Sequence, residues 1–213
     1  MKYGESTFDI LYLLIAIAGG LLILRKSRTR ADTLAGAAVL ILGCGDAFHL
    51  VPRVVNYFAA ADMTAALGVG KLVTSITMTV FYVLLYRLWL AHYGRDEDKS
   101  LSVTVYVLAA VRVVLCLFPQ NGWLTGGGSV LWAILRNAPF TALGAVIVVL
   151  WYRTRTEIAD FRRIWLYVTL SFLFYIPVAV AAGFLPILGM LMLPKTICYI
   201  LIIAAFWRHV RRS

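Results

Sequence analysis

Apolar stretches of about the length that spans a bilayer as a helix, roughly 20 residues, recur along the whole chain. Polar and charged residues gather in short segments between them, and no such segment is long enough to form a soluble domain. The pattern predicts seven transmembrane helices, over residues 8–25, 33–52, 67–92, 101–118, 130–152, 163–184 and 187–207. We therefore expect an all-α, polytopic membrane protein in which residues 1–213 form a single transmembrane domain.

The composition agrees with this pattern. The chain is 62% hydrophobic and only 14% charged, with a mean hydropathy of +0.87. A soluble domain of 213 residues has too small an interior to bury so much apolar side chain. Three cysteines, Cys44, Cys116 and Cys198, lie on separate apolar stretches without the spacing of a metal site. That arrangement is typical of buried free thiols.

The net charge of +10 is explained by where the basic residues lie along the chain. The basic clusters are Arg25–Arg30, Arg87–Lys99, Arg153–Arg163 and Arg208–Arg212. All of them fall at the same end of the predicted bundle, and the loops at the other end contain almost no Lys or Arg. The positive-inside rule therefore predicts an outer N-terminus and an inner C-terminus. It also accounts for the charge without a nucleic-acid partner.

The two halves of the chain resemble each other when they are displaced by 125 residues. The matched positions are Arg28–Arg30 with Arg153–Arg155, Asp32 with Glu157, and Pro52 with Pro177. The match predicts two parallel three-helix repeats, residues 8–92 and 130–207, joined by a linker helix over residues 101–118.

Ionisable residues within the predicted helices share one layer of the bilayer. Five helices contribute to this layer, with Asp46, His49, Lys71, Arg112, Arg136 and Lys195. The helical rise places most of them about 6 to 12 Å from the outer ends of their helices. Because ionisable groups inside a bilayer usually face a cavity or a partner, the layer predicts a polar pocket that opens outward.

Cations outnumber acids in this layer, since Asp46 is its only deep acid. A bound anion would balance the excess, and the alternative is that the long basic side chains reach the outer headgroups. Lys195 is the deepest cation, and we expect Pro194 to disturb the backbone hydrogen bonding beside it. Tyr199 is a candidate for the cavity wall, with aromatic packing as the alternative.

Asp46, His49 and Arg53 lie on one helical stripe at spacings i, i+3 and i+7. Asp46 is either half of a structural ion pair or a functional carboxylate that gates the ligand or carries a proton. His49 is either oriented by Asp46 or turned toward lipid headgroups. His92 and His209 lie at the opposite end, which disfavours a metal site with His49.

Two resemblances concern the overall plan. Two three-helix bundles joined by a fourth helix resemble the SWEET/PQ-loop sugar transporters and the KDEL receptor, although Pro119-Gln120 lies in a loop here. The chain is also similar to microbial rhodopsins, through Lys195 in helix seven and Tyr175-Ile176-Pro177 in helix six. The second resemblance implies retinal as a cofactor on Lys195, with Asp46 as its counter-ion.

A third resemblance is local. Gly45-Asp46-Ala47-x-x-Leu50-x-Pro52-Arg53, with Gly70 and Ser75, is similar to the bacterial lysoplasmalogenase-like (YhhN) family. It implies a membrane hydrolase of alkenyl-ether lysolipids with essential acids inside the bundle, and Asp46 and His49 would then be catalytic. Ile76 stands where a histidine is expected, and helix six holds no second acid.

The leading prediction is a pocket that binds or transports a small anionic or zwitterionic molecule, or a lipid headgroup, in a bacterial inner or plasma membrane. No cofactor is expected for that function. The predicted ligand-binding residues are Asp46, His49, Arg53, Lys71, Arg112, Arg136, Lys195 and Tyr199. Lysolipid hydrolysis and a retinal chromophore are the alternatives, and the expected partners are membrane lipids, the small ligand and a second copy of the chain.

Overall fold

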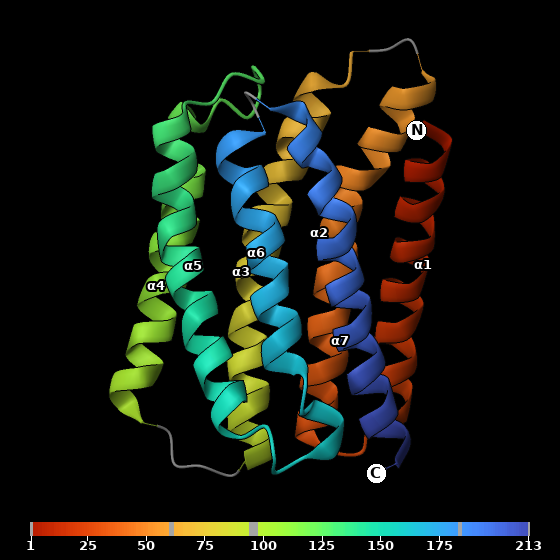
Figure 1. Ribbon diagram of the computed structural model, residues 1–213, viewed down its shortest axis with the longest axis vertical. Coiled ribbons are helices and arrows are strands. Elements are labelled where there is room, and N and C mark those ends of the chain that lie inside the picture. The colour runs from red at the N-terminus through yellow and green to blue at the C-terminus, as the bar shows by residue number, and fades with distance from the viewer. Residues whose placement is uncertain (1, 60–61, 94–97, 183–184, 213) are drawn as a thin grey trace.

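The computed structural model describes residues 2–59, 62–93, 98–182 and 185–212. Over these residues the chain is all-helical, with seven helices that run up and down through one bundle (Figure 1). They are α1 (Lys2–Lys26), α2 (Arg30–Phe58), α3 (Thr64–Tyr93), α4 (Lys99–Leu117), α5 (Val130–Arg153), α6 (Ile164–Ala181) and α7 (Met192–Arg212). Three short 3-10 helices connect them: η1 (Pro119–Asn121), η2 (Ala159–Phe161) and η3 (Pro186–Leu191).

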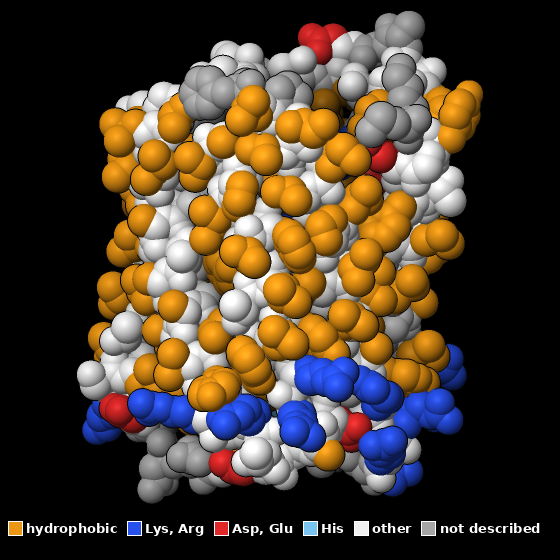
Figure 2. Space-filling view, in the orientation of Figure 1, with side chains coloured by type: hydrophobic (Ala, Val, Ile, Leu, Met, Phe, Trp, Pro, Cys, Tyr) orange, Lys and Arg blue, Asp and Glu red, His pale blue; other side chains and the backbone are white. Residues whose placement is uncertain are grey.

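Seven helical segments of the described chain are long and apolar enough to cross a membrane. This confirms the predicted all-α, multi-pass membrane protein. Figure 2 shows a broad apolar band across this face of the bundle and a belt of Lys and Arg below it. The belt lies at the end of the bundle that holds the C-terminus, and we call it the basic end. The opposite end, where α1 begins, is the N-terminal end. Arg95, one of the predicted basic residues, lies outside the described residues.

The predicted end of the second helix, residue 52, was wrong. Helix α2 continues through Pro52 to Phe58, so the first part of the predicted loop is helical. The last candidate membrane span begins at Ile187, as predicted, but its first residues form η3 and α7 begins at Met192. Pro194 therefore occupies the first turn of α7, where its missing N–H has no intrahelical partner to lose. Helix α7 continues through Pro194 and Lys195.

The helices follow one another around the bundle. Helix α1 packs on α2 and α2 on α3, α4 lies against α3 and α5, and α6 and α7 complete the circuit. Helix α7 returns to contact both α1 and α2, which closes the bundle. Helix α3 contacts α2, α4 and α5 and so occupies an inner position. Side chains from all seven helices can therefore face a common interior.

Aromatic side chains fill the middle of the bundle. The cluster consists of Phe81, Tyr82, Phe140, Phe172 and Tyr199, each at most 8% exposed. The ring of Tyr82 meets Phe140 edge-on at 5.1 Å, and the Phe81 ring meets Tyr199 at 5.9 Å between centroids. Each such pair contributes about 0.5–1.5 kcal/mol beyond the area it buries. The aromatic cluster packs α3 of the first half of the chain against α5, α6 and α7 of the second half.

Glycines bring α2 and α3 into close contact near the N-terminal end. A Cβ atom on Gly70 would overlap the backbone carbonyl of Phe48, and one on Gly45 would overlap the Thr77 side chain. The Phe48 carbonyl lies four residues before Pro52, whose ring nitrogen has no hydrogen to donate to it. A glycine on α3 therefore packs where the α2 ladder lacks a hydrogen bond. This contact fixes the register of the two helices that carry Asp46, His49 and Lys71.

We expect Gly70→Ala to lower the midpoint of thermal unfolding, because the added methyl group overlaps main-chain atoms that cannot rotate away. Overpacking of this kind costs about 1–3 kcal/mol. Gly4→Ala on α1 is the matched control, since a Cβ there meets nothing within 4 Å. Scanning fluorimetry of the detergent-purified proteins measures the difference. Equal midpoints for the two variants would contradict the proposed packing.

Candidate functional site

A cavity of about 690 Å³ lies inside the bundle toward its N-terminal end. All seven α-helices contribute to its wall, together with the loop between α4 and α5. Seven of the eight residues predicted to bind ligand line it: Asp46, His49, Arg53, Lys71, Arg112, Arg136 and Lys195. The eighth, Tyr199, is 2% exposed and belongs to the aromatic cluster beneath the cavity.

The acidic residues of the cavity lie on α1 and α2. The hydroxyl of Tyr12 on α1 donates a hydrogen bond to Oδ2 of Asp46 on α2, at 2.6 Å. Among the residues that the structure describes, Asp46 forms no ion pair with Arg53, Lys71 or Lys195. Asp9 is 6% exposed, and its buried Oδ2 has no hydrogen-bond partner in the described chain.

Arg53 has partners of its own on the α1 side of the cavity. Its guanidinium lies 3.4 Å from Oε2 of Glu5 and donates from Nε to the Tyr57 hydroxyl at 3.2 Å. The Tyr57 hydroxyl in turn donates to Glu5 at 2.7 Å. This network ties the start of α1 to the last turns of α2. Arg53 is thus the one predicted cavity cation that the described structure neutralises with a carboxylate.

Arg112 is buried, only 1% exposed, and its contacts are with neutral groups. Its Nη1 donates to Oδ1 of Asn137 at 3.0 Å and to the backbone oxygen of Arg136 at 3.2 Å. The guanidinium also lies 3.6 Å from the centre of the Phe140 ring. Asn137 Oδ1 accepts a second bond from the Tyr175 hydroxyl at 2.8 Å. These contacts hold the cation in place without cancelling its charge.

Arg136 is held in the same way by the α4–α5 connection. Its Nη1 donates to Oδ1 of Asn121 at 2.7 Å, and its guanidinium lies 4.7 Å from the Trp123 ring. Asn121 and Trp123 in turn donate to main-chain oxygens at the end of α4, including that of Cys116. The predicted loop is therefore an ordered wall of the cavity.

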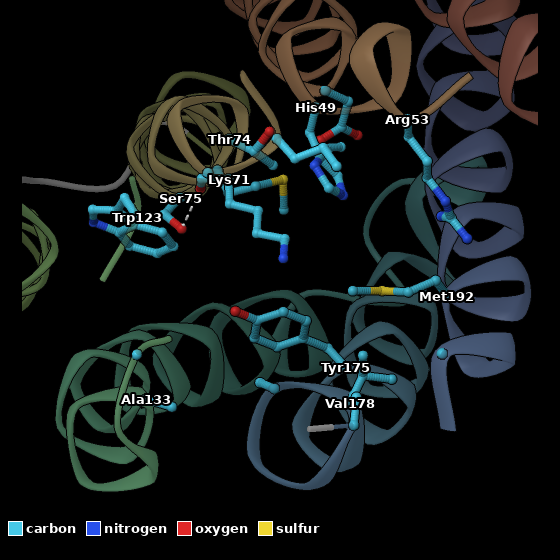
Figure 3. A pocket seen from close by; sticks show the side chains of 18 of the residues that line it. His49, Arg53, Lys71, Thr74, Ser75, Trp123, Ala133, Tyr175, Val178 and Met192 are labelled. Carbon is cyan, nitrogen blue, oxygen red and sulfur yellow. Dashed lines mark hydrogen bonds between the residues drawn. The ribbon is translucent and has the colours of Figure 1, made fainter. Parts of the chain in front are cut away.

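Like Arg112 and Arg136, Lys71 and Lys195 have no anionic partner in the described chain. Figure 3 shows Lys71 extending from α3 into the cavity, toward Tyr175 on the opposite wall. The Lys195 ammonium lies over the rings of Tyr175 and Tyr199, at 4.9 and 5.3 Å from their centres. Aromatic faces stabilise an ammonium group but carry no net negative charge. Neither lysine is paired with a carboxylate of the described chain, so both are available to contact an anion in the cavity.

His49 lies near Lys71 and Arg53 on the cavity wall (Figure 3). Its Nδ1 is buried without a hydrogen-bond partner in the described chain. His92 and His209 lie at the basic end, where their rings are 4.8 Å apart, and they do not join His49. No three His, Cys, Asp or Glu side chains of the described residues come together as a metal site.

Several residues that complete the site were missed by reasoning from sequence. These are Glu5, Tyr12, Tyr57, Asn121 and Asn137, which orient the charged residues. Asn137 offered the clearest signal, because an amide in an apolar helix is costly to bury unless it is hydrogen-bonded. The others lie near helix ends or are tyrosines, whose positions alone do not distinguish a partner from an interface residue.

The chain was compared with protein-family models, with curated proteins and with solved structures, and none of the three comparisons found a match.

We expect Asn137→Leu to destabilise the protein, because the buried Arg112 and the half-buried Tyr175 each lose the Asn137 oxygen as a hydrogen-bond acceptor. Leaving such groups unpaired costs about 1–3 kcal/mol for each neutral group and more for a charged one. Thr169→Val is the control, since the Thr169 hydroxyl bonds only to the Trp165 carbonyl of its own helix. Chemical denaturation in detergent measures both. A loss no larger than that of the control would show that Asn137 does not anchor Arg112.

Proposed function

We propose that this membrane protein binds a small anionic or zwitterionic molecule in its cavity, as a binding protein or as one state of a transporter. The observation that carries the proposal is that Lys71 and Lys195 line the cavity without an anionic partner in the described chain. Arg112 and Arg136 add charge that only neutral groups contact. Cations held this way in a low-dielectric interior favour an anion strongly.

The size of the cavity agrees with a binding site for a small molecule. Its volume lies within the range of about 300–1,000 Å³ that is usual for small-molecule sites. On the side toward the basic end, the aromatic cluster separates it from the remainder of the bundle. Transport would require these aromatic side chains to move apart in a second state.

We further propose that the N-terminal end faces outward and the basic end faces the cytoplasm. The concentration of Lys and Arg at one end supports this orientation through the positive-inside rule. The cavity would then receive its ligand from outside or from the outer leaflet. The proposed parallel repeat is supported by Pro52 in α2 and Pro177 in α6, which lie within the helices at matched positions.

We expect wild-type protein in maltoside micelles to bind inorganic phosphate and phosphocholine in a calorimetric titration. Lys71→Met and Lys195→Met should each weaken the Kd about tenfold or more, since a contact between charged groups contributes about 1.5–3 kcal/mol. Lys99→Met is the matched control, because Lys99 is exposed at the basic end. Unchanged affinity in both cavity variants would overturn the proposal, as would the failure of every small anion or zwitterion to bind.

A second candidate function, hydrolysis of a lysolipid, is favoured by one observation. His49 presents a buried, unpartnered Nδ1 at the cavity wall, one helical turn from Asp46. An acid and an imidazole so placed are groups that can activate water and shuttle its proton. Tyr12 would orient the Asp46 carboxylate through its short hydrogen bond.

For this second candidate, Asp46→Asn should reduce turnover of an alkenyl-ether lysolipid by about a hundredfold or more while the protein stays folded. The amide oxygen keeps an acceptor for Tyr12, so the substitution removes charge with little change of shape. Asp62→Asn, in the exposed segment before α3, is the control. Wild-type protein that releases no aldehyde would eliminate hydrolysis of this lipid class and leave binding as the function.

A further inference from the structure

A second cavity lies on the outer face of the bundle, between α5 and α6. It is a groove of about 390 Å³, and the α5 residues along it include Ile134, Ala138, Ala142 and Ala145. Figure 1 shows α5 and α6 side by side, and the two helices are in contact. Ala138, Ala142 and Ala145 are exposed, so this face of α5 looks toward the bilayer.

The groove exists because α5 carries small side chains on this face. Alanines at 138, 142 and 145 follow the i, i+4, i+7 spacing of one helical stripe. Elsewhere on its exposed face α5 carries large side chains, such as Leu131 at 62% and Val149 at 48% exposure. An empty apolar groove would lack dispersion contacts along its walls. In a bilayer, hydrocarbon chains fill the groove and supply these contacts.

The groove and the cation-rich cavity share part of their walls. Ala179 and Val180 of α6 line both. Asn137 lines the groove, while its amide oxygen accepts hydrogen bonds from Arg112 and Tyr175, which line the cavity. The two spaces are therefore neighbours across a thin wall, one cationic and the other apolar.

We propose that the ligand is an anionic amphiphile whose headgroup sits in the cavity and whose hydrocarbon chain lies in the groove between α5 and α6. This inference rests on the proposed function, since it assigns the charged part of the ligand to the same site. A cationic space that shares wall residues with a lipid-facing apolar space complements a molecule that is anionic at one end and apolar at the other. Such a ligand reaches the site sideways from the bilayer and not only from the aqueous phase.

The test compares methyl phosphate with hexyl phosphate, which carry the same headgroup on chains of different length. Binding is measured by calorimetric titration of the whole protein in maltoside micelles. We expect hexyl phosphate to bind at least tenfold more tightly than methyl phosphate. Ala142→Phe, which fills the groove, should remove this gain and leave the affinity for methyl phosphate within twofold. Ala138→Leu is a second groove variant in case the first does not fold.

Val149→Phe is the matched control, because it adds a ring to the exposed face of α5 outside the groove. It should retain the full gain of the longer chain. Equal affinity of the wild type for the two phosphates would overturn the inference and leave the proposed function standing. Failure of both alkyl phosphates to bind would overturn the inference, and failure of inorganic phosphate and phosphocholine as well would overturn the proposed function.

A third outcome concerns a second copy of the chain, since small residues four apart also allow helices to pack closely. The oligomeric state is measured by size-exclusion chromatography with light scattering. A dimer that Ala142→Phe dissociates and Val149→Phe does not would assign the groove to that contact and overturn the inference. An unchanged oligomeric state, together with loss of the chain-length gain, supports the lipid chain as occupant.

Discussion

A charge inside a bilayer must be compensated within the protein, because hydrocarbon offers it neither water nor counter-ions. This constraint is clearest at Arg112, which is almost fully buried and is held by an amide, a backbone carbonyl and an aromatic ring. The positions of Asn137, Phe140 and Tyr175 all follow from it. Three helices, α4, α5 and α6, are thereby joined around one guanidinium. The cavity is the space that this arrangement leaves open.

The two sides of the cavity meet this constraint differently. On the α1–α2 side, Glu5 neutralises Arg53, and Tyr12 supports the Asp46 carboxylate. On the other side, Asn121, Asn137, Trp123 and Tyr175 contact cations but carry no charge. The α1–α2 wall thus carries the carboxylates of the cavity together with Arg53, whereas the charged side chains of the opposite wall are all cations. A ligand with negative charge completes it, and a zwitterion that places its anion toward α3, α5 and α7 does so as well.

Small residues shape both the interior of the bundle and its lipid-facing surface. Gly45 and Gly70 let α2 and α3 approach, which brings the Asp46 stripe beside Lys71. Alanines on α5 leave the groove toward the bilayer, and Ala179 connects its wall with that of the cavity. The polar cavity and the apolar groove together have the character of an amphiphile site. The proposed lipid ligand therefore depends on tertiary packing as much as on charge.

The amino-acid sequence alone was sufficient for the membrane class, the seven helices and the layer of ionisable residues. These follow from local quantities, namely the length of apolar stretches and the distance of each charge from a helix end. The sequence did not predict which side chains form hydrogen bonds with one another, because partners such as Tyr12 and Asp46 are 34 residues apart and meet only when the helices pack. Tyr199 illustrates the same limit. It is next to Lys195 on α7 by helical spacing, yet it turns below the cavity into the aromatic cluster. The helix sequence predicts which side chains lie near one another along a stripe, whereas the rotation of each helix against its neighbours decides whether they face a ligand or the core.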